Sequence, residues 1–192
     1  MATEQVPYVV ERSLGENVEV RRYDQAIVAE TVIDTEAYAD AGNEGFRRLA
    51  GYIFGANASR DQLAMTAPVA MAGAVSGEKI AMTAPVAVVA DGAGWRMAFF
   101  MPAGYTLQTL PRPLDARVML REVPARRVAA LRFSGRGTAA QFAERTEELR
   151  ATLSAAGLET QGESWAARYD APWVRPPLRR NEAMIELAAA AQ

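Results

Sequence analysis

A six-residue segment that occurs twice constrains this chain more than any other feature. Residues 64–69 read Ala-Met-Thr-Ala-Pro-Val, and residues 81–86 repeat the same letters. Alternate side chains of an extended chain face opposite ways, and proline lacks the N–H that a central strand needs. We therefore expect two strands in which Pro68 and Pro85 lie at an edge, an end or a bulge. The methionines of both copies either fill a core or line a ligand cavity, since methionine adapts to irregular apolar shapes.

Two segments of the chain have helical periodicity. The first follows a strand at residues 26–33 that is rich in β-branched residues. Asp34 or Thr35 is the expected N-cap, and the helix ends near Gly55. Glycine costs a helix roughly 1 kcal/mol relative to alanine, so Gly42 and Gly45 indicate that a sheet, or a flat ligand, approaches this helix closely. Close packing of the helix on a sheet is the expected reason.

The second helix has clearer signals at both ends. Thr138 is the expected N-cap, and Gly157 followed by Leu158 is typical of a glycine that ends a helix together with its apolar partner. Apolar residues between these ends recur at helical spacing, which predicts one buried stripe. Further strands are expected at residues 6–11, 18–22, 95–101, 117–122, 127–133, 164–169 and 182–188.

The order of strand, helix and strands therefore occurs twice, in residues 18–101 and 117–188. This pattern predicts an α+β fold in which two pseudo-repeats form one distorted antiparallel sheet or barrel flanked by two helices. A length of 192 residues suits a single domain over residues 1–192. We expect the alanine-rich tail, residues 189–192, to fray.

Composition excludes several classes of function. The formal net charge is −2, so the sequence gives no reason to expect nucleic acid as a partner. No signal peptide is evident, and no apolar run approaches the roughly 20 residues that cross a membrane. We therefore expect a cytoplasmic protein without a membrane partner. The sequence has no cysteine and no histidine, which removes disulfides, thiolates and the commonest haem ligand.

No catalytic motif is found in the sequence. It lacks a phosphate-binding loop and a nucleophile elbow, and a serine triad would have no histidine to use. The acidic pair Glu147 and Glu148 lies on a predicted helix among arginines, where solvated surface is the expected role. The sequence therefore predicts a protein that is not an enzyme.

Residues 79–86, Lys-Ile-Ala-Met-Thr-Ala-Pro-Val, resemble the signature of the SOUL family of haem-binding proteins. Further segments with a similar resemblance occur in the same order as in the family, at residues 18–23, 131–135, 169–173 and 179–182. The resemblance implies a distorted antiparallel barrel flanked by two helices. The duplicated motif looks more like the bacterial and plant branch than the animal one.

The same resemblance implies binding of haem or another tetrapyrrole in an apolar cleft beside the first helix. Aligned on that helix, the cofactor-binding residues would be Asn43, Phe46, Arg47 and Ala50. Phe46 and Ala50 would contact the ring, and Arg47 would pair with a propionate. Ligation of iron by histidine is excluded, which leaves as formal candidates Met65, Met82, Met97, Met101, Tyr38, Tyr52 and Tyr105.

Two other functions remain open at this point. The chain could bind a different small hydrophobic or planar ligand in the same place, since the face between helix and sheet is an ordinary ligand site. It could also be a protein–protein interaction domain, which an exposed apolar patch without a pocket would favour. The sequence leaves the oligomeric state open.

Overall fold

The computed structural model describes residues 4–58 and 77–189. The first copy of the repeated segment, residues 64–69, lies outside these residues, as do Met65, Pro68 and the tail from residue 190. The helices are α1 (Tyr38–Ile53) and α3 (Ala139–Ala155), with a short 3-10 turn η1 (Pro176–Leu178). The strands are β1 (Glu4–Gln5), β2 (Tyr8–Ser13), β3 (Val18–Tyr23), β4 (Ala26–Ile33), β5 (Asn57–Ala58), β6 (Thr83–Asp91), β7 (Gly94–Phe100), β8 (Arg112–Pro113), β9 (Met119–Val123), β10 (Arg126–Phe133), β11 (Thr160–Arg168) and β12 (Asn181–Leu187).

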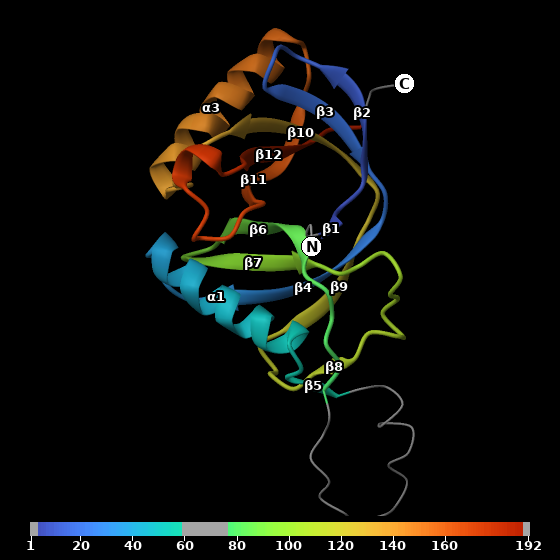
Figure 1. Cartoon of the computed structure of the whole chain (residues 1–192). Coiled ribbons are helices and arrows are strands. Elements are labelled where there is room, and N and C mark those ends of the chain that lie inside the picture. Colours follow the sequence, from blue (N-terminus) through green and yellow to red (C-terminus); the bar gives the residue numbers. More distant parts are fainter. Residues whose placement is uncertain (1–3, 59–76, 190–192) are drawn as a thin grey trace, which may run out of the picture.

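One curled antiparallel sheet organises the described part of the chain. Its strands follow the order β2-β3-β10-β12-β11-β6-β7-β4-β9, and β1 adds to β6 in parallel. Both helices lie on the same side of this sheet, α1 over β4 and β7 and α3 over β10 and β12 (Figure 1). The predicted α+β class is confirmed, with two helices flanking a half-barrel.

The two halves of the sheet have the same topology and exchange one strand. In the first half β4, β7 and β6 are neighbours and carry α1; in the second half β10, β12 and β11 are neighbours and carry α3. The strand before β4 is β3, yet it pairs with β10 of the other half. The strand before β10 is β9, and it pairs with β4. Strands β6 and β11 join the halves at the centre.

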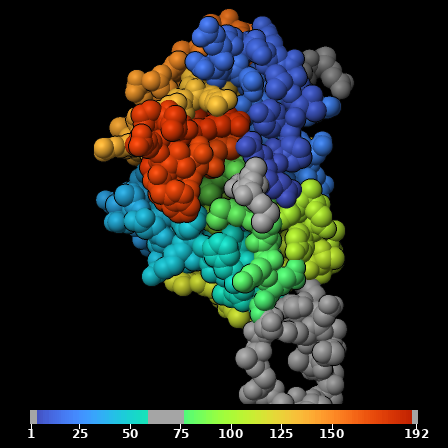
Figure 2. All heavy atoms as spheres, viewed as in Figure 1, coloured from blue at the N-terminus to red at the C-terminus, as the bar shows by residue number. Residues whose placement is uncertain are grey.

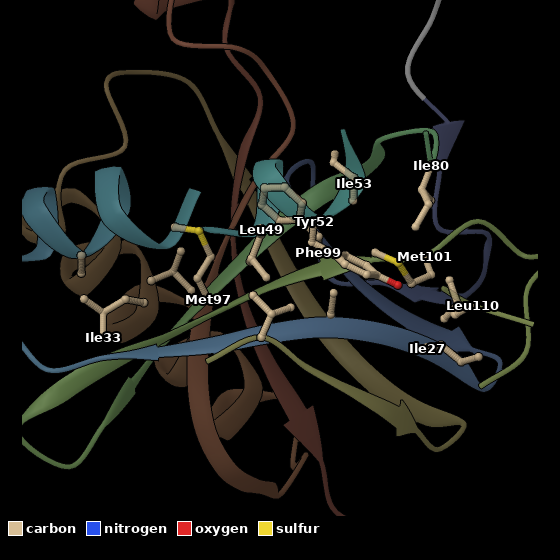
Figure 3. Close-up of a cluster of buried hydrophobic side chains, with 14 of the residues drawn as sticks. Ile27, Ile33, Leu49, Tyr52, Ile53, Ile80, Met97, Phe99, Met101 and Leu110 are labelled. Carbon is tan, nitrogen blue, oxygen red and sulfur yellow. The ribbon is translucent and has the colours of Figure 1, made fainter. Parts of the chain in front are cut away.

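Helix α1 packs on the sheet through a glycine, as expected, but begins later than expected. A Cβ atom at Gly45 would lie 2.9 Å from Ile33 Cδ1 and 3.1 Å from Met97 Cβ, so any larger residue would force these side chains or the helix to move. Figure 3 shows Leu49, Tyr52 and Ile53 of α1 in the buried cluster with Met97 and Phe99.

The expected role of Gly42 is wrong, because an added Cβ would meet nothing within 4 Å. The predicted N-cap is also wrong: Ala37 occupies that position and no side chain caps the helix. Trp95 of β7 donates a hydrogen bond from Nε1 to Glu36 O at 3.3 Å. This contact holds Glu36 outside the helix, so the helix begins after the predicted N-cap positions Asp34 and Thr35.

The second copy of the repeated segment enters the centre of the sheet. Its last four residues begin β6, while Ala81 and Met82 precede the strand. The register of β6 against β7 shifts between Thr83 and Val86. Pro85 lies inside this irregularity, where regular strand pairing is interrupted and the N–H that proline lacks is not needed. Of the three positions predicted for Pro85, an edge, an end or a bulge, the structure shows an irregularity of the bulge type near the start of β6.

Both ends of α3 match the sequence signals. Thr138 accepts a hydrogen bond from the backbone of Gln141, whose side chain accepts one from Thr138 N, which completes a capping box. Gly157 has φ +68°, and Leu158 N donates to Leu153 O at 2.9 Å. This is the expected left-handed glycine with its apolar partner.

Candidate ligand-binding surface

The two helices meet over the central strand pair of the sheet. Val86 of β6 lies opposite Phe99 of β7 on one side and opposite Arg168 of β11 on the other. Directly paired residues of antiparallel strands share a face, and here that face is the one that the helices cover. We call this region the helix junction; its members are Tyr38, Val86, Val88, Phe142, Ala166 and Arg168.

Phe46 extends this region along α1. Its ring centroid lies 5.4 Å from that of Phe99 in an edge-to-face arrangement, and yet 41% of Phe46 is exposed. Phe54, just after α1, is 61% exposed. Figure 2 shows the C-terminal segment in red between α3 in orange and α1 in cyan, so the two helices and this segment share one face of the molecule.

The other residues predicted for the cofactor differ in their environment. Asn43 and Arg47 are exposed, and Arg47 already donates a hydrogen bond to Glu44 on the same helix. Ala50 is buried, with 9% of its surface exposed. The ring of Phe46 is therefore partly exposed. Arg47, which was predicted to bind a propionate, already has Glu44 as a carboxylate partner.

Most of the candidate iron ligands are buried in the core or hydrogen-bonded to other groups. Met97 and Met101 are buried in the cluster under α1 (Figure 3). Tyr52 is also buried, and its hydroxyl donates to Pro111 O at 2.9 Å; the hydroxyl of Tyr105 donates to Glu78 Oε1 at 2.6 Å. Met82 is only partly buried against the same cluster.

The helix junction contains a cation that sequence analysis missed. The Arg168 guanidinium carbon lies 5.1 Å from the ring centroid of Tyr38 and 5.8 Å from that of Phe142. Burial raises the pKa of Tyr38, and the nearby Arg168 lowers it by a smaller amount. Strand alternation gave a usable signal, because Arg168 must face away from Trp165 and Ala167. A charge on a face that helices cover is unusual and could have marked this residue.

The opposite, concave face of the sheet offers less room near its centre. A hollow of about 20 Å³ lies among Tyr23, Phe100, Arg126 and Trp165, which is space for about one water molecule. A wider hollow of about 340 Å³ opens at one end of the sheet, with Glu4, Asp24 and Glu122 among its lining residues. The central hollow is therefore too small for a planar ligand, whereas the ring of Phe46 is partly exposed on the other face of the sheet.

Residues 4–58 and 77–189 lack two kinds of feature. They contain no group of three or more histidine, cysteine, aspartate or glutamate side chains placed to hold a metal ion. In the same residues no helix is long and apolar enough to span a membrane.

The sequence matches the family model described as SOUL heme-binding protein over residues 3–76 and 71–186. Each matched segment contains one copy of the repeated motif. A comparison with curated proteins returns no match.

Solved structures share the fold. A hydrolase from Listeria innocua is 10% identical with a TM-score of 0.56, and the alignment covers 90% of this chain and 92% of that one. The C-terminal domain of EcmrR is 10% identical with a TM-score of 0.57, covering 89% of this chain and 96% of that domain. EcmrR in its complex with DNA is 10% identical with a TM-score of 0.58, covering 92% of this chain and 59% of that one. At such low identity the likeness extends to the fold alone.

Proposed function

The chain belongs to the SOUL heme-binding protein family, and from this premise we propose that it binds haem or a related tetrapyrrole on the surface of α1. Binding is non-covalent and uses apolar contact beside the helix. Histidine takes no part, because the sequence has none. The residues we assign to the ring are Phe46 and Ala50, with Asn43 and Arg47 at its border.

The exposed ring of Phe46 is the observation that carries this proposal. An aromatic side chain that is 41% exposed beside a buried aromatic partner, Phe99, gives up contact with water when a flat apolar molecule covers it. Burial of apolar surface contributes roughly 25 cal/mol for each Å². Phe54, which is 61% exposed, adds apolar surface beyond the end of the same helix.

The chemistry of the available side chains fits a weakly ligated or unligated macrocycle. The sequence lacks histidine and cysteine, while Met97 and Met101 are held in the core. Met82, which is partly buried, is the described methionine candidate that retains access to solvent. Affinity would therefore come from the ring and its side groups rather than from the iron.

We further propose that the protein binds and does not transform its ligand. The Listeria hydrolase shares only the fold at 10% identity, and this chain has no histidine or cysteine to act as base or nucleophile. Carriage or storage of the ligand is the role that fits such a surface.

A haemin titration of the purified protein, followed at the Soret band, tests the proposal. We expect saturable one-to-one binding in the micromolar range for the wild type. Phe46→Asp places a charge where the ring would lie and should weaken binding at least tenfold, a difference of about 1.4 kcal/mol. Val9→Asp is the matched control, because Val9 is 54% exposed on β2, away from α1.

Two results would count against the proposal. Non-saturable binding by the wild type would mean that this chain lacks the binding property for which its family is named. Saturable binding that Phe46→Asp and Val9→Asp leave equally unchanged would place the site elsewhere. In either case, tighter binding of an unrelated planar hydrophobic molecule would favour the second function, a module for another small ligand.

A further inference from the structure

Arg168 is a partly buried cation without a carboxylate partner. None of the ion pairs among the described residues includes it. Its Nη2 donates to Gly137 O, and its guanidinium lies over the rings of Tyr38 and Phe142. Contact with aromatic faces stabilises a cation in part, but it supplies no counter-charge.

Two polar atoms at this position are buried and make no hydrogen bond of good geometry within residues 4–58 and 77–189, although the two side chains lie close enough for Arg168 to lower the pKa of Tyr38. They are Nε of Arg168 and the hydroxyl oxygen of Tyr38. Buried donors without acceptors are rare in native structures, and each asks for a water, an ion or a ligand. Both groups can donate a hydrogen bond, although the hydroxyl oxygen of Tyr38 can also accept one. Because Arg168 carries a positive charge and has no carboxylate partner among the described residues, an acceptor with negative charge would satisfy both donors best.

The position of Arg168 relative to Phe46 suggests which ligand supplies this acceptor. Phe46 packs on Phe99, and Phe99, Val86 and Arg168 lie side by side on the neighbouring strands β7, β6 and β11. Two strand spacings separate Phe99 from Arg168, which is about 10 Å. A flat ring that covers Phe46 can thus extend a side group to Arg168 over the apolar surface of Val86.

We propose that Arg168 and Tyr38 bind a carboxylate of the planar ligand whose ring lies against Phe46. The inference rests on the proposed function and narrows its ligand to an acid, such as a tetrapyrrole with propionates. It moves the anion contact from Arg47, which is exposed and paired with Glu44, to a cation between two aromatic rings. A guanidinium can bind a carboxylate through two N–H donors in a less hydrated place, which makes the contact stronger.

The affinities for haemin and for haemin dimethyl ester, measured side by side, distinguish the carboxylate contact from binding of the ring. Both molecules present the same macrocycle, but the ester lacks the carboxylates. We expect Arg168→Gln to weaken haemin roughly tenfold and Tyr38→Phe to weaken it roughly threefold, with the affinity of the ester unchanged in both. Arg12→Gln is the charge-matched control, since Arg12 is exposed on β2. Tyr38→Phe removes only a hydroxyl that has no partner and should fold as the wild type does.

The inference is overturned if Arg168→Gln weakens haemin and the ester equally, or if neither it nor Tyr38→Phe changes the affinity for haemin. Failure of the proposed function has a different signature: the wild type then binds neither molecule, or Phe46→Asp leaves the affinities for both unchanged. Arg168→Lys keeps the charge without the fork of donors and is expected to retain an intermediate preference for the acid.

Discussion

Arg21 of β3 holds Glu182 of β12 through two parallel hydrogen bonds, Nη1 to Oε2 at 2.7 Å and Nη2 to Oε1 at 2.9 Å. Glu182 is fully buried and Arg21 is 2% exposed. Tyr169 and Arg180 also donate to this carboxylate, at 2.6 and 2.7 Å. With its hydrogen-bond capacity filled in this way, the buried charge is tolerated.

Removing the charge of Glu182 should destabilise the protein severely. Glu182→Gln removes the buried counter-charge of Arg21 and leaves it only the partly exposed Glu19, whose Oε2 accepts from Arg21 Nε at 2.8 Å. We expect a loss of about 3 kcal/mol or more in the free energy of unfolding. The control is Glu11→Gln, whose partner Arg127 is partly exposed and whose loss should cost below about 1 kcal/mol. Urea unfolding followed by circular dichroism measures both. Equal effects of the two substitutions would contradict the view that burial makes the difference.

Stability should fall in acid through the same group. Burial raises the pKa of Glu182, but hydrogen bonds from Arg21 and Tyr169 lower it, and the net result is a pKa below the ordinary value of 4.5. A carboxylate with a lowered folded-state pKa stabilises the fold above its unfolded-state pKa, and this contribution is lost as the pH falls through the folded-state value.

We therefore expect the unfolding free energy of the wild type to decrease progressively once the pH falls below 4.5. Glu182→Gln should have a smaller slope in this range. A weaker slope will remain, because hydrogen bonds from Arg117 lower the pKa of the partly exposed Asp115 to about 2. Urea titrations at neutral and acid pH give the comparison, and identical slopes for wild type and variant would refute the assignment.

Two glycines on α1 should respond in opposite ways to a larger side chain. Gly42→Ala adds a methyl group in open space and should stabilise the helix by about 1 kcal/mol. Gly45→Val places atoms against Ile33 and Met97, where the first carbon alone lies 2.9 and 3.1 Å from its neighbours, and should destabilise by roughly 2 kcal/mol. Thermal unfolding of the two variants tests this. A higher melting temperature in both would show that the packing at Gly45 is looser than described.

Local signals predicted much of the fold. Strand β4 has the expected bounds, Ala26–Ile33, because β-branched residues and flanking turns define it without help from distant residues. Thr138 and Gly157 fixed the ends of α3 for the same reason, since each acts on its own helix. The two-residue strands β5 and β8 were missed, because so short a pairing has no periodicity.

The candidate site was only partly predictable. Phe46 was found because helical spacing places it at the border of the apolar stripe. The start of α1 was misplaced, since Trp95 from a distant strand holds Glu36 outside the helix. Strand alternation could have placed Arg168 on the face that the helices cover, but its contact with Tyr38 and Phe142 depends on two different helices meeting over β11. No local pattern encodes that meeting.

The crossing of β3 into the second half and of β9 into the first has a consequence for how the chain comes apart. Each half lacks one of its own strands and borrows the equivalent strand of the other, so neither half is complete alone. Its strand pairs join residues far apart in sequence, which predicts slow folding and a single cooperative transition rather than stepwise melting. Although the strand–helix pattern occurs twice, neither half can unfold while the other keeps its complete set of strands.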